Sequence, residues 1–69
     1  MNPRINPRKL ALARKKTKLP ITAVAEFTGT NPTYIGCIES GRIPLSCDSE
    51  MARQLIEMYG VSIDDVCDK

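Results

Sequence analysis

Residues 19–42 have the sequence LPITAVAEFTGTNPTYIGCIESGR, and this stretch decides the fold of the chain. Apolar side chains recur in it at helical spacing in two groups, Ile21, Val24 and Ala25 and then Ile35 and Ile38. Pro20 begins the first group and Gly29 ends it, while Asn31-Pro32 begins the second and Gly41 ends it. An Asn-Pro pair favours a helix start and a glycine favours a helix end. The stretch predicts two short helices joined by a tight turn.

The sequence before this stretch predicts one more helix. Asn6-Pro7 repeats the Asn-Pro helix start and predicts a helix over residues 7–16, with Leu10 and Ala13 facing inward. Ile5 and Leu10 have the spacing of a hydrophobic staple across this start. We expect residues 1–5 to form a flexible basic N-terminal arm and residues 6–69 to form a single helical domain.

The sequence after the stretch predicts two helices. Residues 42–47 contain Pro44 and are expected to form a loop, followed by a helix that starts near Ser46 or Asp48 and ends at Tyr59. A short fifth helix begins with a capping-box pattern and contains Ile63 and Val66. No segment alternates between apolar and polar residues as a half-buried strand would. The fold class predicted is all-α, with five helices.

The positive charge is concentrated at one end of the chain. Seven of the ten basic side chains lie in residues 1–18, which hold no acid, whereas residues 19–69 hold three basic side chains and all eight acids. Such asymmetry favours contact with a polyanion, and the alternative is a solvated basic segment without a partner.

The composition excludes several function classes. The chain has no histidine and no Cys-x-x-Cys pair, so we expect neither an enzyme nor a metal site, and no cofactor. No apolar run could span a membrane, and MNPRINPRK lacks the apolar segment of a secretion signal, so we expect a cytoplasmic protein of a bacterial or phage-infected cell. With three cysteines, a disulfide framework is not expected, and Cys47 and Cys67 are expected to fill small half-buried gaps.

Five sequence elements carry a resemblance to a known family. They are Leu10-x-x-Ala13-Arg14, Leu19-Pro-Ile-Thr-Ala-Val24-Ala25, Gly29-Thr-Asn31-Pro-Thr-Tyr34-Ile35, Ile38-Glu39-Ser-Gly41-Arg42 and Tyr59-Gly60-Val61-Ser62-Ile63-Asp64-Asp65-Val66. In this order they make residues 10–66 resemble the Cro/phage-repressor (XRE-type) helix-turn-helix family. The resemblance implies a lambda-repressor-like bundle whose second and third helices form the helix-turn-helix. It also implies a sequence-specific DNA-binding transcriptional regulator, a Cro-like repressor, whose third helix enters the major groove of an operator.

The resemblance further implies roles for individual residues. Arg14 and Glu39 would form a structural ion pair between the first and third helices. The third helix would contact DNA through Asn31, Pro32, Thr33, Tyr34, Gly36 and Cys37, and the phosphate backbone would be contacted by Thr22, Ser40 and Arg42. The basic side chains Arg4, Arg8, Lys9, Lys16 and Lys18 would add attraction independent of sequence, with Arg4 reaching a minor groove. The partner is double-stranded DNA, bound by a homodimer whose interface would lie after Gly41, with Val61, Ile63 and Val66 as candidates. The alternative is that these three side chains close the core. RNA polymerase or another regulator is a further possible partner.

The third helix departs from the family pattern. Its DNA-facing positions hold no charged or amide side chain beyond Asn31, so specificity is expected to rest on Thr33, thymine methyl contacts and DNA shape. An alternative is a protein-binding module that uses Ile21, Pro32, Tyr34 and Cys37 as one exposed patch. A further alternative is that oxidation of Cys37 blocks the DNA-facing side.

Overall fold

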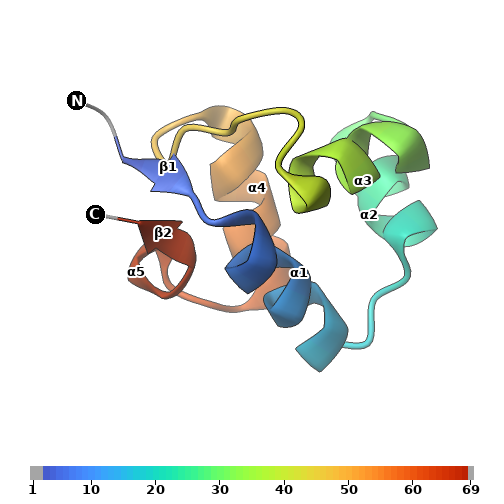
Figure 1. Cartoon of the computed structure of the whole chain (residues 1–69). Coiled ribbons are helices and arrows are strands. Elements are labelled where there is room, and N and C mark those ends of the chain that lie inside the picture. The colour runs from blue at the N-terminus through green and yellow to red at the C-terminus, as the bar shows by residue number, and fades with distance from the viewer. Residues whose placement is uncertain (1–2, 69) are drawn as a thin grey trace.

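The structure, a computed structural model, describes residues 3–68, in which five helices surround one core (Figure 1). The helices are α1 (Pro7–Lys16), α2 (Ile21–Thr28), α3 (Pro32–Ser40), α4 (Glu50–Tyr59) and α5 (Ile63–Val66). The strands, β1 (Arg4–Ile5) and β2 (Cys67–Asp68), form one antiparallel pair. The predicted five-helix bundle is confirmed, and the strand pair is an addition to it. No helix in the described part of the chain is long and apolar enough to cross a membrane.

The starts of α1 and α3 follow from their Asn-Pro pairs. The side chain of Asn6 accepts a hydrogen bond from the backbone N–H of Lys9 at 3.1 Å, and Asn31 accepts one from Tyr34 at 2.9 Å. In both helices the proline occupies the first turn, where its missing N–H leaves no hydrogen bond unmade. The predicted bounds of α1 and α3 are confirmed because each start has a specific side-chain cap.

The predicted start of α4 is wrong, because the helix begins at Glu50 rather than near Ser46 or Asp48. The cap is Ser49, whose hydroxyl accepts from the N–H of Ala52 at 3.2 Å and donates to the carbonyl of Ser46 at 2.7 Å. The side chains of Ser46 and Asp48 hydrogen-bond to each other instead. They shape the loop that leads to the helix and do not begin the helix.

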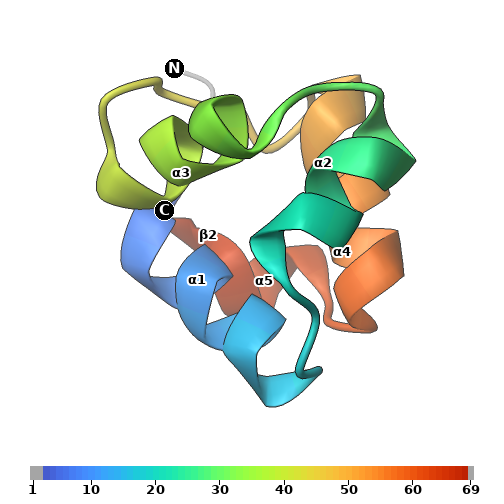
Figure 2. The same cartoon turned by 90° about the vertical axis from the view of Figure 1, so that its right-hand side faces the viewer.

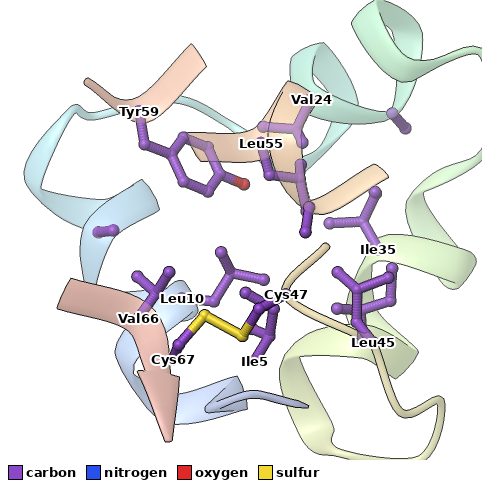
Figure 3. Packing of buried hydrophobic residues seen from close by; sticks show 14 residues of the cluster. Ile5, Leu10, Val24, Ile35, Leu45, Cys47, Leu55, Tyr59, Val66 and Cys67 are labelled. Carbon is purple, nitrogen blue, oxygen red and sulfur yellow. A yellow bond between two sulfur atoms is a disulfide. The ribbon is translucent and has the colours of Figure 1, made fainter. Parts of the chain in front are cut away.

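All five helices contribute to one buried cluster (Figure 3). Its largest fully buried side chains are Leu10, Val24, Ile35, Ile38, Leu55 and Val66. Figure 2 shows α1 and α3 side by side, with α4 behind α2. α3 is thus held on two sides, by α1 and by α2. This packing fixes α3 relative to the rest of the bundle.

The expected flexible arm over residues 1–5 needs correction, although residues 1 and 2 lie outside the described part of the chain. Arg4 pairs with Asp68 and Ile5 with Cys67 in the β1–β2 register, and Arg4 also bridges to Ser46. The N–H of Ile5 donates to the carbonyl of Leu45 at 2.7 Å. Ile5 is 5% exposed. Burial of its side chain, together with these hydrogen bonds, holds this segment against the domain.

The expectation of unpaired cysteines is also wrong for two of the three. Cys47 and Cys67 form a disulfide with their Cα atoms 6.2 Å apart (Figure 3). Both residues belong to the buried cluster, as expected of gap-filling cysteines, but they do so as a bonded pair. Cys37 is a free, half-buried thiol. An odd cysteine count does not exclude one disulfide with a single thiol left over.

Candidate nucleic-acid interface

The corner between α2 and α3 is fixed by hydrogen bonds of its own residues. The N–H of Thr30 donates to the carbonyl of Ala25 at 2.8 Å, and the hydroxyls of Thr28 and Thr30 lie 2.8 Å apart. The hydroxyl of Thr28 also reaches the carbonyl of Val24 at 2.9 Å. Gly29, at φ 69°, supplies the left-handed backbone conformation that the turn requires. α3 therefore leaves the corner in one defined direction.

Ile21 covers Gly36 where the beginning of α2 meets the middle of α3. A Cβ atom placed on Gly36 would lie 3.8 Å from the Cδ1 atom of Ile21. Ile21 is half-buried and packs against the core cluster. Its position is explained by packing between the two helices, without any partner protein.

The apolar patch expected in the protein-binding alternative is only weakly developed. Of its four residues, Pro32 is exposed, whereas Ile21, Tyr34 and Cys37 are half-buried. Ile21 and Tyr34 pack against the core. The large apolar side chains that are exposed within residues 3–68 are Leu12, Phe27 and Ile63, none of which lies on α3. These observations give no support to the patch.

Most of the residues expected to contact DNA are accessible. Three of them, Tyr34, Gly36 and Cys37, are half-buried. The others are exposed, namely Thr22, Asn31, Pro32, Thr33, Ser40, Arg42, Arg4, Arg8, Lys9 and Lys18. The first turn of α3 thus presents Pro32 and Thr33 to solvent, ahead of the half-buried part of the helix.

The end of α3 and the beginning of α1 bring several of these residues together. Arg8 and Ser40 line one surface hollow, and Arg4 and Gly41 line another, with Pro7 common to both. The chain after α3 is held by two hydrogen bonds, in which the N–H groups of Arg42 and Ile43 donate to the carbonyl of Cys37 at 2.9 and 3.2 Å. Cationic groups from α1, β1 and the loop after α3 therefore border the C-terminal end of α3.

Lys9 and Lys18 contribute less positive charge to the C-terminal end of α3 than the other cations do. The ammonium of Lys9 lies 3.8 Å from a carboxylate oxygen of Asp68, so part of its charge is already compensated. Lys18 lies in the α1–α2 connection with φ 58°, at the opposite end of α1 from Arg8. An α-helix of ten residues is about 15 Å long, which separates Lys18 from the cations around Arg8.

The predicted ion pair between α1 and α3 is confirmed. The Nε atom of Arg14 donates to Oε2 of Glu39 at 2.6 Å, and Nη2 donates to Oε1 at 3.1 Å. Nη1 donates to the carbonyl of Leu19 at 2.9 Å, just before α2 begins. The hydrogen bonds to Glu39 raise the pKa of Arg14 above its ordinary value, although burial opposes this. One guanidinium thus ties together α1, the end of α3 and the approach to α2.

Tyr59 reaches the same interior region from α4. It is 3% exposed, and its hydroxyl has no hydrogen-bond partner. The pKa of the phenol is raised to about 12, mainly by burial and also by the negative charge of Glu39, while the charge of Arg14 opposes the shift. Helical periodicity places Tyr59 on the inner face of α4, but no sequence signal shows that its hydroxyl lacks a partner.

Within residues 3–68 no cluster of His, Cys, Asp and Glu side chains is large enough to hold a metal ion. The chemistry available at the α2–α3 face consists of hydroxyl groups, backbone amides and nearby cations. Such groups bind anions and base edges through hydrogen bonds.

Comparison with known proteins agrees with this geometry. A family model described as a helix-turn-helix domain matches residues 8–67. No curated protein matches the chain, and no solved structure matches it. The match spans all five helices apart from the first residue of α1.

Proposed function

Since this chain belongs to the helix-turn-helix domain family, we propose that it is a sequence-specific DNA-binding regulator whose α3 occupies the major groove of an operator. The observation that carries the proposal is the fixed α2–turn–α3 corner with Pro32 and Thr33 exposed on the first turn of α3. The Arg14–Glu39 pair holds the other end of α3. A helix fixed at both ends keeps its exposed face in one orientation when it docks.

Thr33 is the side chain best suited to contact a base edge. It is exposed, it lies in the first turn of α3, and it offers both a hydroxyl group and a methyl group. The hydroxyl can donate to or accept from base edges, and the methyl can contact a thymine methyl. Because Gly36 and Cys37 are half-buried, the sequence preference rests on few direct contacts and on the shape of the DNA.

The phosphate contacts fall on both sides of α3. Thr22 lies at the start of α2, and Ser40, Arg42 and Arg8 lie at the far end of α3. Hydrogen-bond donors on both sides of a recognition helix fix its register along the groove without selecting bases. In this proposal they supply most of the affinity, and Thr33 supplies discrimination.

The proposed mechanism is occupancy: bound at a promoter, the protein acts as a Cro-like repressor by excluding RNA polymerase. A homodimer would place two α3 helices on half-sites one helical turn, or about 34 Å, apart. The longest extent of the described domain is 31 Å, so two copies aligned end to end along that axis would have a spacing close to this value. Among the residues expected at the interface, Val66 is core and Ile63 is exposed, so Ile63 is the better candidate.

The test begins with selection of DNA fragments from a random pool and from the protein's own operon. We expect an enriched inverted repeat. Arg42→Gln should then weaken binding several-fold and lower the slope of affinity against salt by about one unit, whatever the sequence. Thr33→Ala should instead lower the ratio of the affinity for the selected site to the affinity for scrambled DNA.

Arg53→Gln is the matched control, because Arg53 is equally exposed but lies on α4. It should leave affinity and salt slope close to those of the unchanged protein. Failure to enrich any sequence, together with equal effects of Arg42→Gln and Arg53→Gln, would contradict the proposal.

A further inference from the structure

The Cys47–Cys67 disulfide joins two segments that flank residues 3–6 on opposite sides. On one side, Cys47 donates from its N–H to the carbonyl of Pro3 at 3.0 Å, next to the Ile5–Leu45 hydrogen bond. On the other side, the N–H of Asn6 donates to the carbonyl of Val66 at 2.7 Å, and β1 pairs with β2. We call these three segments, residues 3–6, 45–47 and 66–68, the clasp.

The noncovalent contacts of the clasp are few. Its regular strand pairing is two residues long, far below the size at which an isolated pair of strands is stable in water. The side chains of Ile5 and Leu45 are buried beneath it, which adds apolar stabilisation. The disulfide is its one covalent cross-link and closes a loop with a sequence separation of 20 residues. Loss of a cross-link of that size typically shifts the equilibrium between folded and unfolded chain toward the unfolded chain by roughly 100-fold.

The clasp is continuous with the proposed DNA-binding surface. Its loop segment follows α3 directly, through Gly41 and the hydrogen bonds that Arg42 and Ile43 make to Cys37. Arg4 lies on β1, and Arg42 lies five residues before Cys47. Opening of the clasp would therefore release Arg4, whereas Arg42 stays attached to α3 through its hydrogen bond to Cys37.

We propose that the thiol–disulfide state of Cys47 and Cys67 controls DNA affinity, with the oxidised protein as the tighter-binding form. The inference rests on the proposed function. A regulator that acts on DNA in the cytoplasm is exposed to small-molecule thiols such as glutathione, and disulfides found in that compartment usually sense redox state. In the oxidised form the clasp holds Arg4 in place beside the end of α3, and in the reduced form Arg4 must be ordered at the moment of binding.

The chemistry is ordinary thiol–disulfide exchange. A glutathione thiolate attacks one sulfur of Cys47–Cys67, breaks the S–S bond and forms a mixed disulfide, and the other cysteine leaves as a thiolate that takes up a proton. A second glutathione thiolate attacks the glutathione sulfur of the mixed disulfide, and the cysteine held there leaves as a thiolate that also takes up a proton. Two protein thiols and one glutathione disulfide result, and the two electrons come from the two glutathione molecules. Because Cys47 and Cys67 are 9% and 7% exposed, attack requires the clasp to open.

The test uses the full chain carrying Cys37→Ser, so that Cys47 and Cys67 are its only thiols. DNA affinity is compared among the oxidised protein, the protein reduced with excess glutathione, and the Cys47→Ser/Cys67→Ser variant. We expect several-fold tighter binding by the oxidised form, since the cation of Arg4 is pre-positioned beside the end of α3 in it. The double variant should match the reduced form and ignore glutathione. Amide hydrogen exchange at residues 4–6 should rise on reduction by a larger factor than exchange at Ile38.

Equal DNA affinity of the oxidised and reduced forms would overturn the proposal, as would the absence of an intramolecular disulfide by mass spectrometry after equilibration with glutathione disulfide. A redox response that disappears with Cys37→Ser would assign sensing to α3 and also overturn it. If neither form binds any DNA, and the protein with Cys37 unchanged binds none either, the proposed function fails. Hydrogen exchange still shows in that case whether the disulfide holds the clasp, and unchanged exchange at residues 4–6 would refute that part by itself.

Discussion

The carboxylate of Glu39 compensates a cation that is largely enclosed by protein. Its side chain is 12% exposed and that of Arg14 is 15% exposed. Removing one member of such a pair leaves an uncompensated charge and typically costs about 3–5 kcal/mol when burial is complete. We expect Glu39→Gln to lower the free energy of unfolding by about 3 kcal/mol, measured by urea denaturation.

Glu57→Gln is the control for this change, since Glu57 is exposed on α4. It should alter the free energy of unfolding by less than about 0.5 kcal/mol. If the two variants have the same stability, the Arg14–Glu39 pair has no structural role.

The hydroxyl of Tyr59 is buried without a hydrogen-bond partner. A buried polar group that makes no hydrogen bond costs about 1–3 kcal/mol. Tyr59→Phe removes the group and keeps the ring, so we expect the free energy of unfolding to rise by about 1 kcal/mol. Thermal unfolding at neutral pH measures this change in stability. A lower melting temperature for Tyr59→Phe would mean that the hydroxyl makes a hydrogen bond in solution.

The raised pKa of Tyr59 makes stability fall in alkaline solution. The phenol ionises near pH 10 in the unfolded chain and near pH 12 in the folded protein. Above pH 10 the unfolded state therefore gains ionised phenol that the folded state lacks, so the free energy of unfolding decreases as the pH rises. We expect a loss of about 1 kcal/mol between pH 10 and 11 relative to Tyr59→Phe. Parallel pH profiles of the two proteins would show that the phenol is not protected.

At this scale the sequence predicts residue roles only where a pattern identifies both partners. Arg14 and Glu39 are assigned to each other by the family resemblance, and the structure brings them together. The unpartnered hydroxyl of Tyr59 depends on what faces it across the core, and the periodicity of α4 holds no information about that.

At the scale of secondary-structure elements, α3 contains a residue that weakens it. Gly36 lies in the middle of the helix, where glycine is less favourable than alanine by about 1 kcal/mol. An added Cβ would meet Ile21 at an ordinary contact distance of 3.8 Å. We expect Gly36→Ala to raise the free energy of unfolding by about 0.5–1 kcal/mol in chemical denaturation. Gly29→Ala should lower it instead, because φ 69° is strained for alanine.

The sequence predicts the first residue of a helix correctly where only one nearby side chain is a suitable cap. Asn6 and Asn31 each precede a proline, and both begin helices at the expected residue. Before α4 the residues Ser46, Asp48 and Ser49 are all suitable caps. The contact between Ser46 and Asp48 leaves the cap to Ser49, and that competition is settled by loop geometry that the sequence does not reveal.

At the scale of the whole molecule, both ends of the described chain are part of the fold. Ile5 is 5% exposed within the core cluster. Replacing a buried isoleucine by alanine typically costs 2–5 kcal/mol, so Ile5→Ala should lower the free energy of unfolding by about 2–3 kcal/mol. Arg4→Ala, on the exposed neighbour in β1, should change it by less than about 0.5 kcal/mol. If urea denaturation gives the same free energy of unfolding for the two variants, the segment is a flexible arm, as the sequence predicts.

The clasp could not be predicted from the sequence because its strands are very short and its two cysteines lie far apart in the chain. Strands of two residues are too short to show alternation. Cys47 and Cys67 come together because the segments that hold them both pair with residues 3–6, and an odd cysteine count does not indicate which pair forms. The helical bundle was predictable from local periodicity, whereas closure of its ends depends on contacts between distant segments.

The disulfide also determines how the molecule would respond to mechanical load. A force applied at residues 3 and 68 enters through adjacent strands that share a register, so the rungs between them open one at a time. With the Cys47–Cys67 bond intact, tension passes from one sulfur to the other, and α4 and α5, which lie between the two cysteines, carry none of it. A fully stretched oxidised chain is then about 60 Å shorter than a reduced one, at roughly 3.4 Å per residue. α4 and α5 therefore add to the length of the stretched chain only after a reductant has broken the disulfide.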